Sequence, residues 1–156
     1  MRIPWELLPI EPSSIPVLTA KMRGCRYRLG AKADSLDQQL AEIDHIDCSG
    51  FTRILVYKAC GTVSPDGSWH QREYLRKSRF KQSTVEAGKL KDGMLRMFVL
   101  PQQPGPGVGR HVGFILNGMT YESYGGNGPG SRAWTGRGYQ AKCEVFVIAY
   151  PGGKTN

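Results

Sequence analysis

Residues 46–61 read IDCSGFTRILVYKACG, and this stretch predicts the helix on which the rest of the sequence depends. Asp47 or Ser49 can cap the start of the helix, and Gly61 can end it. Cys48 therefore falls in or just before the first turn. The apolar residues of the stretch recur at roughly helical spacing: Phe51, Ile54, Leu55 and Tyr57.

The start of a helix is a favourable place for a reactive thiol such as that of Cys48. Backbone N–H groups and the positive end of the helix dipole stabilise the thiolate, which is the nucleophilic form of cysteine. A free cysteine taken alone is more often a small buried residue that only packs. The assignment of Cys48 as a nucleophile therefore depends on partners from a second stretch of the sequence.

The composition is that of one globular domain. The chain has 156 residues, of which 40% are hydrophobic and 22% charged. We expect a proline-rich arm over residues 1–16, a single domain over residues 17–150 and a flexible tail over residues 151–156. The net charge of +8 implies attraction to polyanions. No nucleic-acid-binding motif accompanies that charge, so we expect no specific nucleic-acid partner.

Four cysteines lie far apart, without the close pairs of zinc sites: Cys25, Cys48, Cys60 and Cys143. The first residues show no basic region followed by an apolar run, so we expect no secretory signal and reduced thiols. No stretch approaches the roughly eighteen apolar residues of a membrane span. The three histidines, His45, His70 and His111, have no ligand spacing, so neither a metal nor a cofactor is expected.

The hydrophobic period changes along the chain from helical to strand-like. Helices are predicted over residues 17–23, 34–44, 48–60 and 69–75. Strands are predicted over residues 94–100, 111–116, 119–124 and 143–149. Loops rich in glycine or proline are predicted over residues 101–109 and 125–138. Helices followed by an antiparallel sheet indicate an α+β fold.

The second important stretch is a predicted hairpin around Asn117-Gly118, which is a strong two-residue turn signal. This turn pairs Leu116 with Met119 and Ile115 with Thr120. The same register puts His111 and Glu122 on one face of the sheet, one diagonal step apart.

A carboxylate beside an imidazole fixes its tautomer and makes it a better base for a cysteine nucleophile. The residues therefore suggest a catalytic triad of Cys48, His111 and Glu122, with Gly113 leaving room between the last two. A turn shifted by one residue would instead put Ser123 beside His111.

Two motifs together resemble a known family. Asp47-Cys48-Ser49-Gly50-Phe51, followed by Gly109-Arg110-His111-Val112-Gly113-Phe114-Ile115, is similar to the signature of NlpC-type cell-wall cysteine peptidases, a papain-like group. Weaker matches lie in the family's order at residues 27–30, 90–98 and 120–123. The resemblance covers residues 24–149 and implies a papain-like fold, with N-terminal helices packed on a C-terminal antiparallel sheet.

The resemblance implies hydrolysis of an amide bond in the peptidoglycan stem peptide, commonly between D-glutamate and the diamino acid that follows. By matching positions, Cys48 would attack, His111 would act as base and then as acid, and Glu122 would orient His111. The backbone N–H of Cys48 would stabilise the oxyanion. Three residues are expected to contact the substrate: Tyr27, Asp47 and Ser49.

The chain also departs from the family's pattern. The third position of the family is most often histidine, where this chain has Glu122. The segment between Tyr27 and Cys48 is longer than usual, and Lys91-Asp92-Gly93 replaces the order Pro-Gly-Asp.

We expect a monomer made in the cytoplasm that reaches the bacterial cell wall or periplasm after lysis, through a secretion system or on a phage. An antibacterial, bacteriolytic role would bring an immunity or delivery protein as a partner. Two alternative functions are a papain-like toxin or effector acting on another amide or ester, as a deamidase or acyltransferase, and a non-enzymatic wall-binding module.

Overall fold

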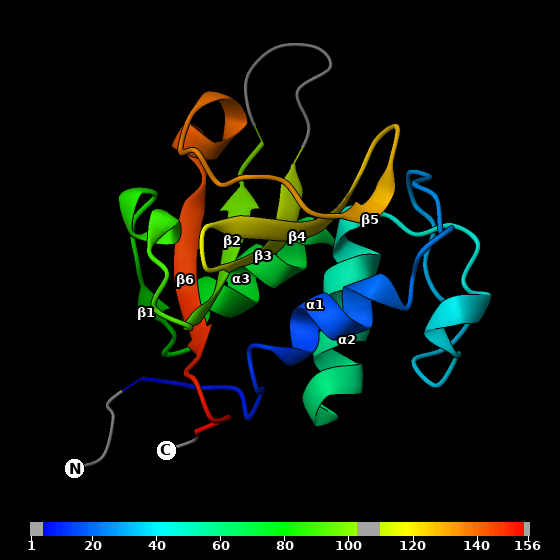
Figure 1. Ribbon diagram of the computed structural model, residues 1–156, viewed down its shortest axis with the longest axis horizontal. Coiled ribbons are helices and arrows are strands. Elements are labelled where there is room, and N and C mark those ends of the chain that lie inside the picture. Colours follow the sequence, from blue (N-terminus) through cyan, green and yellow to red (C-terminus); the bar gives the residue numbers. More distant parts are fainter. Residues whose placement is uncertain (1–4, 103–109, 155–156) are drawn as a thin grey trace.

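The computed structural model describes residues 5–102 and 110–154. Its α-helices are α1 (Ser14–Ala20), α2 (Cys48–Cys60) and α3 (Ser68–Lys77), and its 3₁₀ turns are η1 (Leu40–Glu42), η2 (Glu86–Lys89) and η3 (Gly138–Lys142). Its strands are β1 (Lys81–Gln82), β2 (Leu95–Leu100), β3 (His111–Leu116), β4 (Met119–Tyr124), β5 (Gly128–Gly130) and β6 (Glu144–Ala149). Figure 1 shows the arrangement of these elements.

The strands form one antiparallel sheet in the order β1-β6-β2-β3-β4-β5. The strands β2, β3 and β6 are almost fully buried, because the sheet is covered on both faces. With three helices preceding most of the sheet, the α+β prediction is confirmed.

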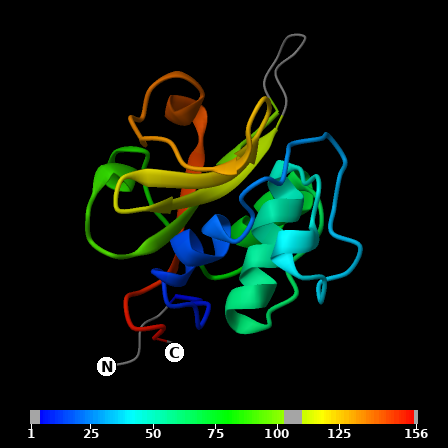
Figure 2. The ribbon, with the colours of Figure 1, turned by 45° about the vertical axis from the view of Figure 1, so that its right-hand side comes forward.

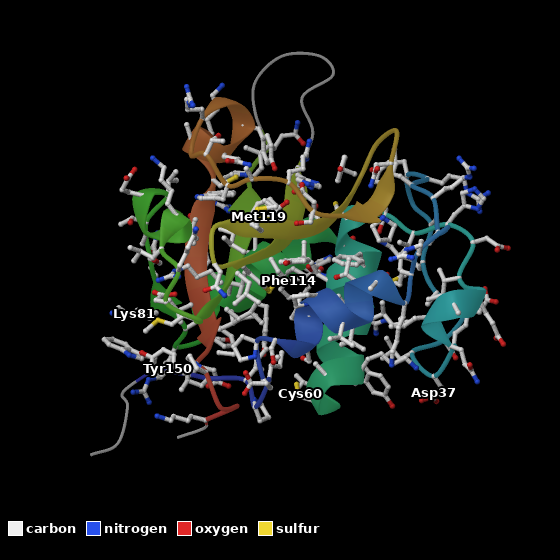
Figure 3. All side chains as sticks on the ribbon, in the orientation of Figure 1. Asp37, Cys60, Lys81, Phe114, Met119 and Tyr150 are labelled. Atoms are coloured by element: carbon white, nitrogen blue, oxygen red, sulfur yellow. The ribbon has the colours of Figure 1, made fainter. Side chains whose placement is uncertain are left out.

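The larger core lies between the helices and one face of the sheet (Figure 2). Figure 3 shows Phe114 of β3 between the sheet and the helices, where its ring packs edge-on against Phe51 of α2 with centroids 6.2 Å apart. The smaller core covers the other face, and it joins the strands to the segment of residues 131–143. Its buried members are Phe98, Leu100, Ile115, Trp134, Cys143 and Val145.

Helix α2 begins and ends where the sequence predicts. The side chain of Asp47 caps it by accepting a hydrogen bond from the backbone N–H of Gly50 at 2.7 Å. Gly61 ends it in the left-handed region at φ 77°, where glycine carries no steric penalty.

The hairpin between β3 and β4 also has the predicted register. Asn117 and Gly118 have φ values of 51° and 78°, as a tight two-residue hairpin turn requires. The pairs Leu116–Met119 and Ile115–Thr120 are both present. The two-residue turn is therefore confirmed, and with it the side of the sheet on which each hairpin residue lies.

The helix predicted over residues 34–44 is wrong. Only isolated turns form there, including η1, because the side chain of Gln38 accepts a hydrogen bond from the backbone N–H of Asp34 and donates one to the carbonyl of Glu42. The residues around His45 are extended, because the backbone of Arg26 forms hydrogen bonds with the residues directly before and directly after His45.

Other boundaries differ from the predictions in smaller ways. Helix α1 starts at Ser14 rather than at residue 17, since Pro16 is tolerated in a first helical turn. The loop predicted over residues 125–138 contains β5, whose sequence Gly-Pro-Gly suits an edge strand but reads as a turn. Strand β1 was not predicted, because it is only two exposed residues long.

The described part of the arm lies against the domain. Leu8 donates a backbone hydrogen bond to Ile148 of β6, and Gly152 of the tail donates one to the side chain of Glu11. Residues 1–4 of the arm, 103–109 of the predicted loop, which include Gly109 of the histidine motif, and 155–156 of the tail lie outside the described residues. Within residues 5–102 and 110–154, no helix has both the length and the apolar character to cross a membrane.

Replacing Gly113 by alanine should destabilise the fold. An ideal Cβ at this position would lie 2.5 Å from the ring of Phe98 and 2.9 Å from the Cβ of Glu122. Since both neighbours are buried in the packed sheet, we expect a loss of about 1–3 kcal/mol in the free energy of unfolding, measured by urea denaturation. Gly125→Ala is the matched control, because its Cβ would meet nothing within 4 Å. Equal effects of the two substitutions would contradict the steric argument.

Candidate active site

Cys48 is the first residue of α2, directly after the capping residue Asp47. Its side chain is mostly covered, with the residue 8% exposed. At this position the sulfur lies at the positive end of the helix dipole, which favours a negative charge. This is the position that the sequence predicts for the thiol of Cys48.

Lys32 holds the residues at the start of α2 in place. Its ammonium group contacts both carboxylate oxygens of Asp47, at 2.7 and 2.6 Å, and the hydroxyl oxygen of Ser49 at 2.7 Å. It also lies 3.3 Å from the carboxylate of Asp66, in the turn before α3. The polar groups of Asp47 and Ser49 are thus engaged within the protein, and both residues are buried.

His111 stands at the start of β3 and connects Cys48 with Glu122. Its Nε2 lies 2.7 Å from Oε1 of Glu122, and Cys48 lies close enough to its ring to contribute to its pKa. Since Nε2 is taken by the carboxylate, Nδ1 is the ring nitrogen left for the sulfur. Burial lowers the pKa of His111, but the hydrogen bonds and charges of Cys48 and Glu122 outweigh burial and raise it to about 9.

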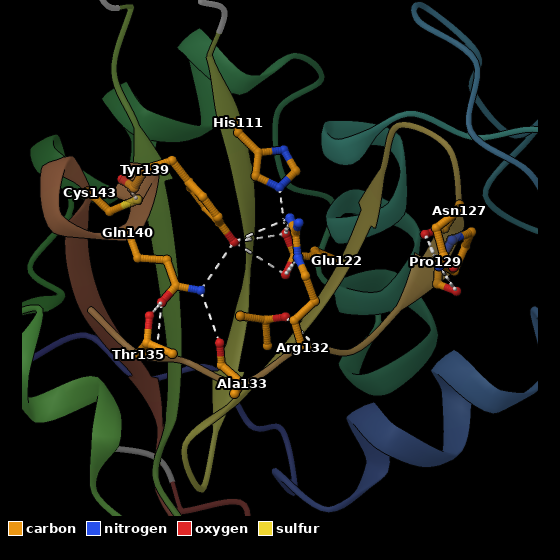
Figure 4. Close-up of polar contacts among 12 residues, drawn as sticks. His111, Glu122, Asn127, Pro129, Arg132, Ala133, Thr135, Tyr139, Gln140 and Cys143 are labelled. Atoms are coloured by element: carbon orange, nitrogen blue, oxygen red, sulfur yellow. Dashed lines mark hydrogen bonds and ion pairs between the residues drawn. The ribbon is translucent and has the colours of Figure 1, made fainter. Parts of the chain in front are cut away.

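Glu122 of β4 has no solvent exposure, yet it is charged. Nη2 and Nε of Arg132 donate to its two oxygens at 2.7 and 3.3 Å, and the hydroxyl of Tyr139 donates at 3.2 Å (Figure 4). Burial raises the pKa of Glu122, but hydrogen bonds from His111, Arg132 and Thr120 lower it to about 2. The carboxylate is therefore held ionised beside the imidazole.

The alternative third residue, Ser123, points away from His111. Its hydroxyl donates to the carbonyl oxygen of Ile46 at 2.8 Å, just before the cap of α2. Neighbouring strand residues face opposite sides of a sheet, so Glu122 and Ser123 cannot share one. The structure brings together Cys48, His111 and Glu122.

Aromatic rings hold the imidazole of His111 in place. Its centroid lies 5.6 Å from that of Phe98 and 5.8 Å from that of Tyr139. The space that Gly113 leaves on the sheet is filled by the ring of Phe98. Burial raises the pKa of Tyr139 to about 12, so its hydroxyl stays protonated and donates to Glu122.

A cavity of about 280 Å³ opens at His111. Its lining residues are Tyr27, Leu100, His111, Tyr124, Gly125, Arg132 and Tyr139. Burial raises the pKa of Tyr27, and the nearby charges of Cys48 and Asp47 raise it further, which places this phenol close to the thiol. Of the three residues expected to contact the substrate, only Tyr27 lines this cavity.

Arg132 and Tyr139 are site residues that the sequence analysis missed. Both lie in the segment after β5, and nothing in their spacing from His111 or Glu122 marks them. The one signal was indirect: a carboxylate on a buried strand needs a cationic partner. That signal does not say which of the chain's 21 lysines and arginines supplies the charge.

The other thiols differ from Cys48 in their surroundings. Burial and the charge of Asp44 raise the pKa of Cys25 to about 11, and burial and the charge of Glu122 raise that of Cys143 to about 12. Cys60 is half-buried near the other end of α2, and all four cysteines are unpaired. Among the residues that the structure describes, no three His, Cys, Asp or Glu side chains form a group able to hold a metal ion.

No protein-family model and no curated protein matches this sequence. The fold is similar to that of an NLP/P60 family protein from Staphylococcus aureus, described as similar to lipoprotein, with a TM-score of 0.58 and 17% identity over 90% of this chain. This chain covers 42% of that protein's length. It is also similar to the NlpC/p60 domain of the peptidoglycan hydrolase SagA, with a TM-score of 0.57 and 19% identity over 88% of this chain and 98% of that domain. The chain therefore has the NlpC/P60 fold that its motifs predict.

Alkylation should distinguish Cys48 from the other thiols. At pH 7 we expect iodoacetamide to modify Cys48 first, because burial raises the pKa of Cys25 and Cys143, whereas Cys48 lies at the start of a helix near His111. Peptide mass spectrometry over a time course measures the rate at each site. Equal rates at all four cysteines would contradict an activated thiol at Cys48.

Proposed function

We propose that this chain is a cysteine hydrolase of the NlpC/P60 family that cleaves an amide bond in the peptidoglycan stem peptide. The observation that carries the proposal is that Cys48, the first residue of α2, lies near His111, whose Nε2 is held by Glu122 at 2.7 Å. The fold supports the choice of substrate, since SagA, whose NlpC/p60 domain is similar, is a peptidoglycan hydrolase.

In the first step the sulfur of Cys48 attacks the carbonyl carbon of the scissile amide. The raised pKa of His111 favours an imidazolium beside the sulfur, and the thiolate is the form of Cys48 that attacks. Negative charge develops on the carbonyl oxygen, and the backbone N–H of Cys48 stabilises it at the start of the helix.

The next steps use the proton on His111. The imidazolium gives this proton to the leaving amine as the carbon–nitrogen bond breaks, which leaves a thioester on Cys48. His111 then takes a proton from water, whose oxygen attacks the thioester carbon. The carbon–sulfur bond breaks, the acid product leaves, and the thiolate and the imidazolium are restored.

The remaining site residues act around this chemistry. Glu122 orients His111 and stabilises its positive charge, and Tyr27 contacts the substrate from the cavity wall. Asp47 and Ser49 act through the helix cap and Lys32, which fix the direction of Cys48. The bond proposed for cleavage joins D-glutamate to the diamino acid, and the site of action is the cell wall.

Cys48→Ala should abolish hydrolysis and leave the fold intact, because it removes the nucleophile but little packing. Purified muropeptides are incubated with each variant under reducing conditions, and the products are identified by mass. Cys60→Ala is the matched control, since Cys60 lies near the far end of α2 (Figure 3) and should leave cleavage unchanged. Activity that survives in Cys48→Ala would contradict the mechanism. If the wild type cleaves no muropeptide but Cys48 still reacts rapidly with alkylating reagents, another amide or ester becomes the better substrate.

The pH dependence of kcat/KM should show an alkaline limb near pH 9. His111 must be protonated to donate to the leaving amine, and its pKa is raised to about 9, so activity falls as the pH rises through that value. Glu122→Gln removes a charge that raises this pKa, so the limb should move to lower pH. A limb at the same pH in both proteins, with the variant folded by circular dichroism, would contradict the role of Glu122.

A further inference from the structure

Arg132 lies in the wall of the cavity beside the reacting groups, and its side chain is 39% exposed. Its Nη2 and Nε hold the two oxygens of Glu122, and Nη2 also lies 3.3 Å from the hydroxyl of Tyr139. A guanidinium group has five N–H donors in a fixed plane, two of them on Nη1. Nη1 makes no hydrogen bond to the described residues, so its two N–H donors are available to a ligand.

The guanidinium is held rigidly in that orientation. Its carbon lies 3.9 Å from the ring centroid of Tyr124 and 5.2 Å from that of Tyr139. Cation–π contacts with these two rings and pairing with Glu122 restrain the group before any ligand binds; Figure 4 shows the pairing with Glu122. A donor that is already oriented loses little entropy when it binds an acceptor.

The cavity wall is rich in donors and lacks carboxylates. The described residues that line it include Arg132, His111 and three tyrosines, but no aspartate or glutamate. Glu122 is not among the lining residues. It has no solvent exposure, and both its carboxylate oxygens accept hydrogen bonds within the protein. Such a wall favours an anionic group on the substrate, and a carboxylate oxygen is a strong acceptor for the remaining N–H donors of Nη1.

We propose that Arg132 binds a free carboxylate of the substrate next to the scissile amide, in addition to holding Glu122. This inference rests on the proposed function, and there the group would be the α-carboxylate of D-glutamate. Stem peptides in which that carboxylate is amidated would then be poorer substrates. Arg132 becomes a specificity-determining residue of the site.

The first test needs no peptidoglycan. Cys48 is alkylated in parallel with iodoacetate, which carries a carboxylate, and with iodoacetamide, which is its neutral analogue. The ratio of the two rates should fall about tenfold in Arg132→Gln, as the loss of one charge-assisted hydrogen bond predicts. Arg137→Gln removes an equal charge from an exposed position of the same segment and should leave the ratio unchanged. The same ratio in wild type and Arg132→Gln would overturn the proposal.

A second measurement uses only the wild-type protein, so it holds even if Arg132→Gln fails to fold. Glutarate should slow the reaction of Cys48 with iodoacetamide, and the neutral glutaramide should not. Equal protection by the two compounds, or none by glutarate, would overturn the proposal.

The third test compares two stem peptides that differ only in the α-group of D-glutamate, one carboxylate and one carboxamide. We expect about tenfold higher kcat/KM for the carboxylate, mainly through KM, and loss of this preference in Arg132→Gln. Equal cleavage of both peptides by the wild type would count against the role of Arg132. Cleavage of neither would instead count against the proposed function, and the alkylation ratio would still decide on Arg132.

Discussion

The site depends on a charged carboxylate that has no contact with solvent. Glu122 can stay ionised there only because Arg132, Tyr139 and His111 all donate to it. A buried charge without such partners would be strongly destabilising, so placing these residues together stabilises the sheet around Glu122. The requirement that stabilises the fold is thus the same one that orients the imidazole toward Cys48.

Strand β4 connects His111 with the segment just before α2, which carries Cys48. On one face, Glu122 holds His111, and on the other face, Ser123 binds the carbonyl of Ile46 just before the cap of α2. Lys32 completes the connection from the helix side by holding Asp47. Adjacent residues of one strand therefore help to set the positions of both His111 and the start of the helix that carries Cys48.

The features that follow from short-range rules could be predicted. The cap and length of α2, the turn at Asn117-Gly118 and the placement of Glu122 beside His111 all follow from local chemistry and the two-residue period of strands. Arg132 could not be found in this way, because its contact with Glu122 depends on how a glycine-rich loop folds back. The helix expected over residues 34–44 failed, because side-chain hydrogen bonds to the backbone competed with helical ones.

The neighbouring positions of Glu122 and Ser123 constrain how this hairpin can evolve. An insertion or deletion of a single residue between His111 and Ser123 would exchange the faces of the two side chains. The hydroxyl would then meet the imidazole and the carboxylate would meet the carbonyl of Ile46, so one genetic event would break both connections. Sequence length should therefore vary among homologous hairpins far less than in the segment between Tyr27 and Cys48.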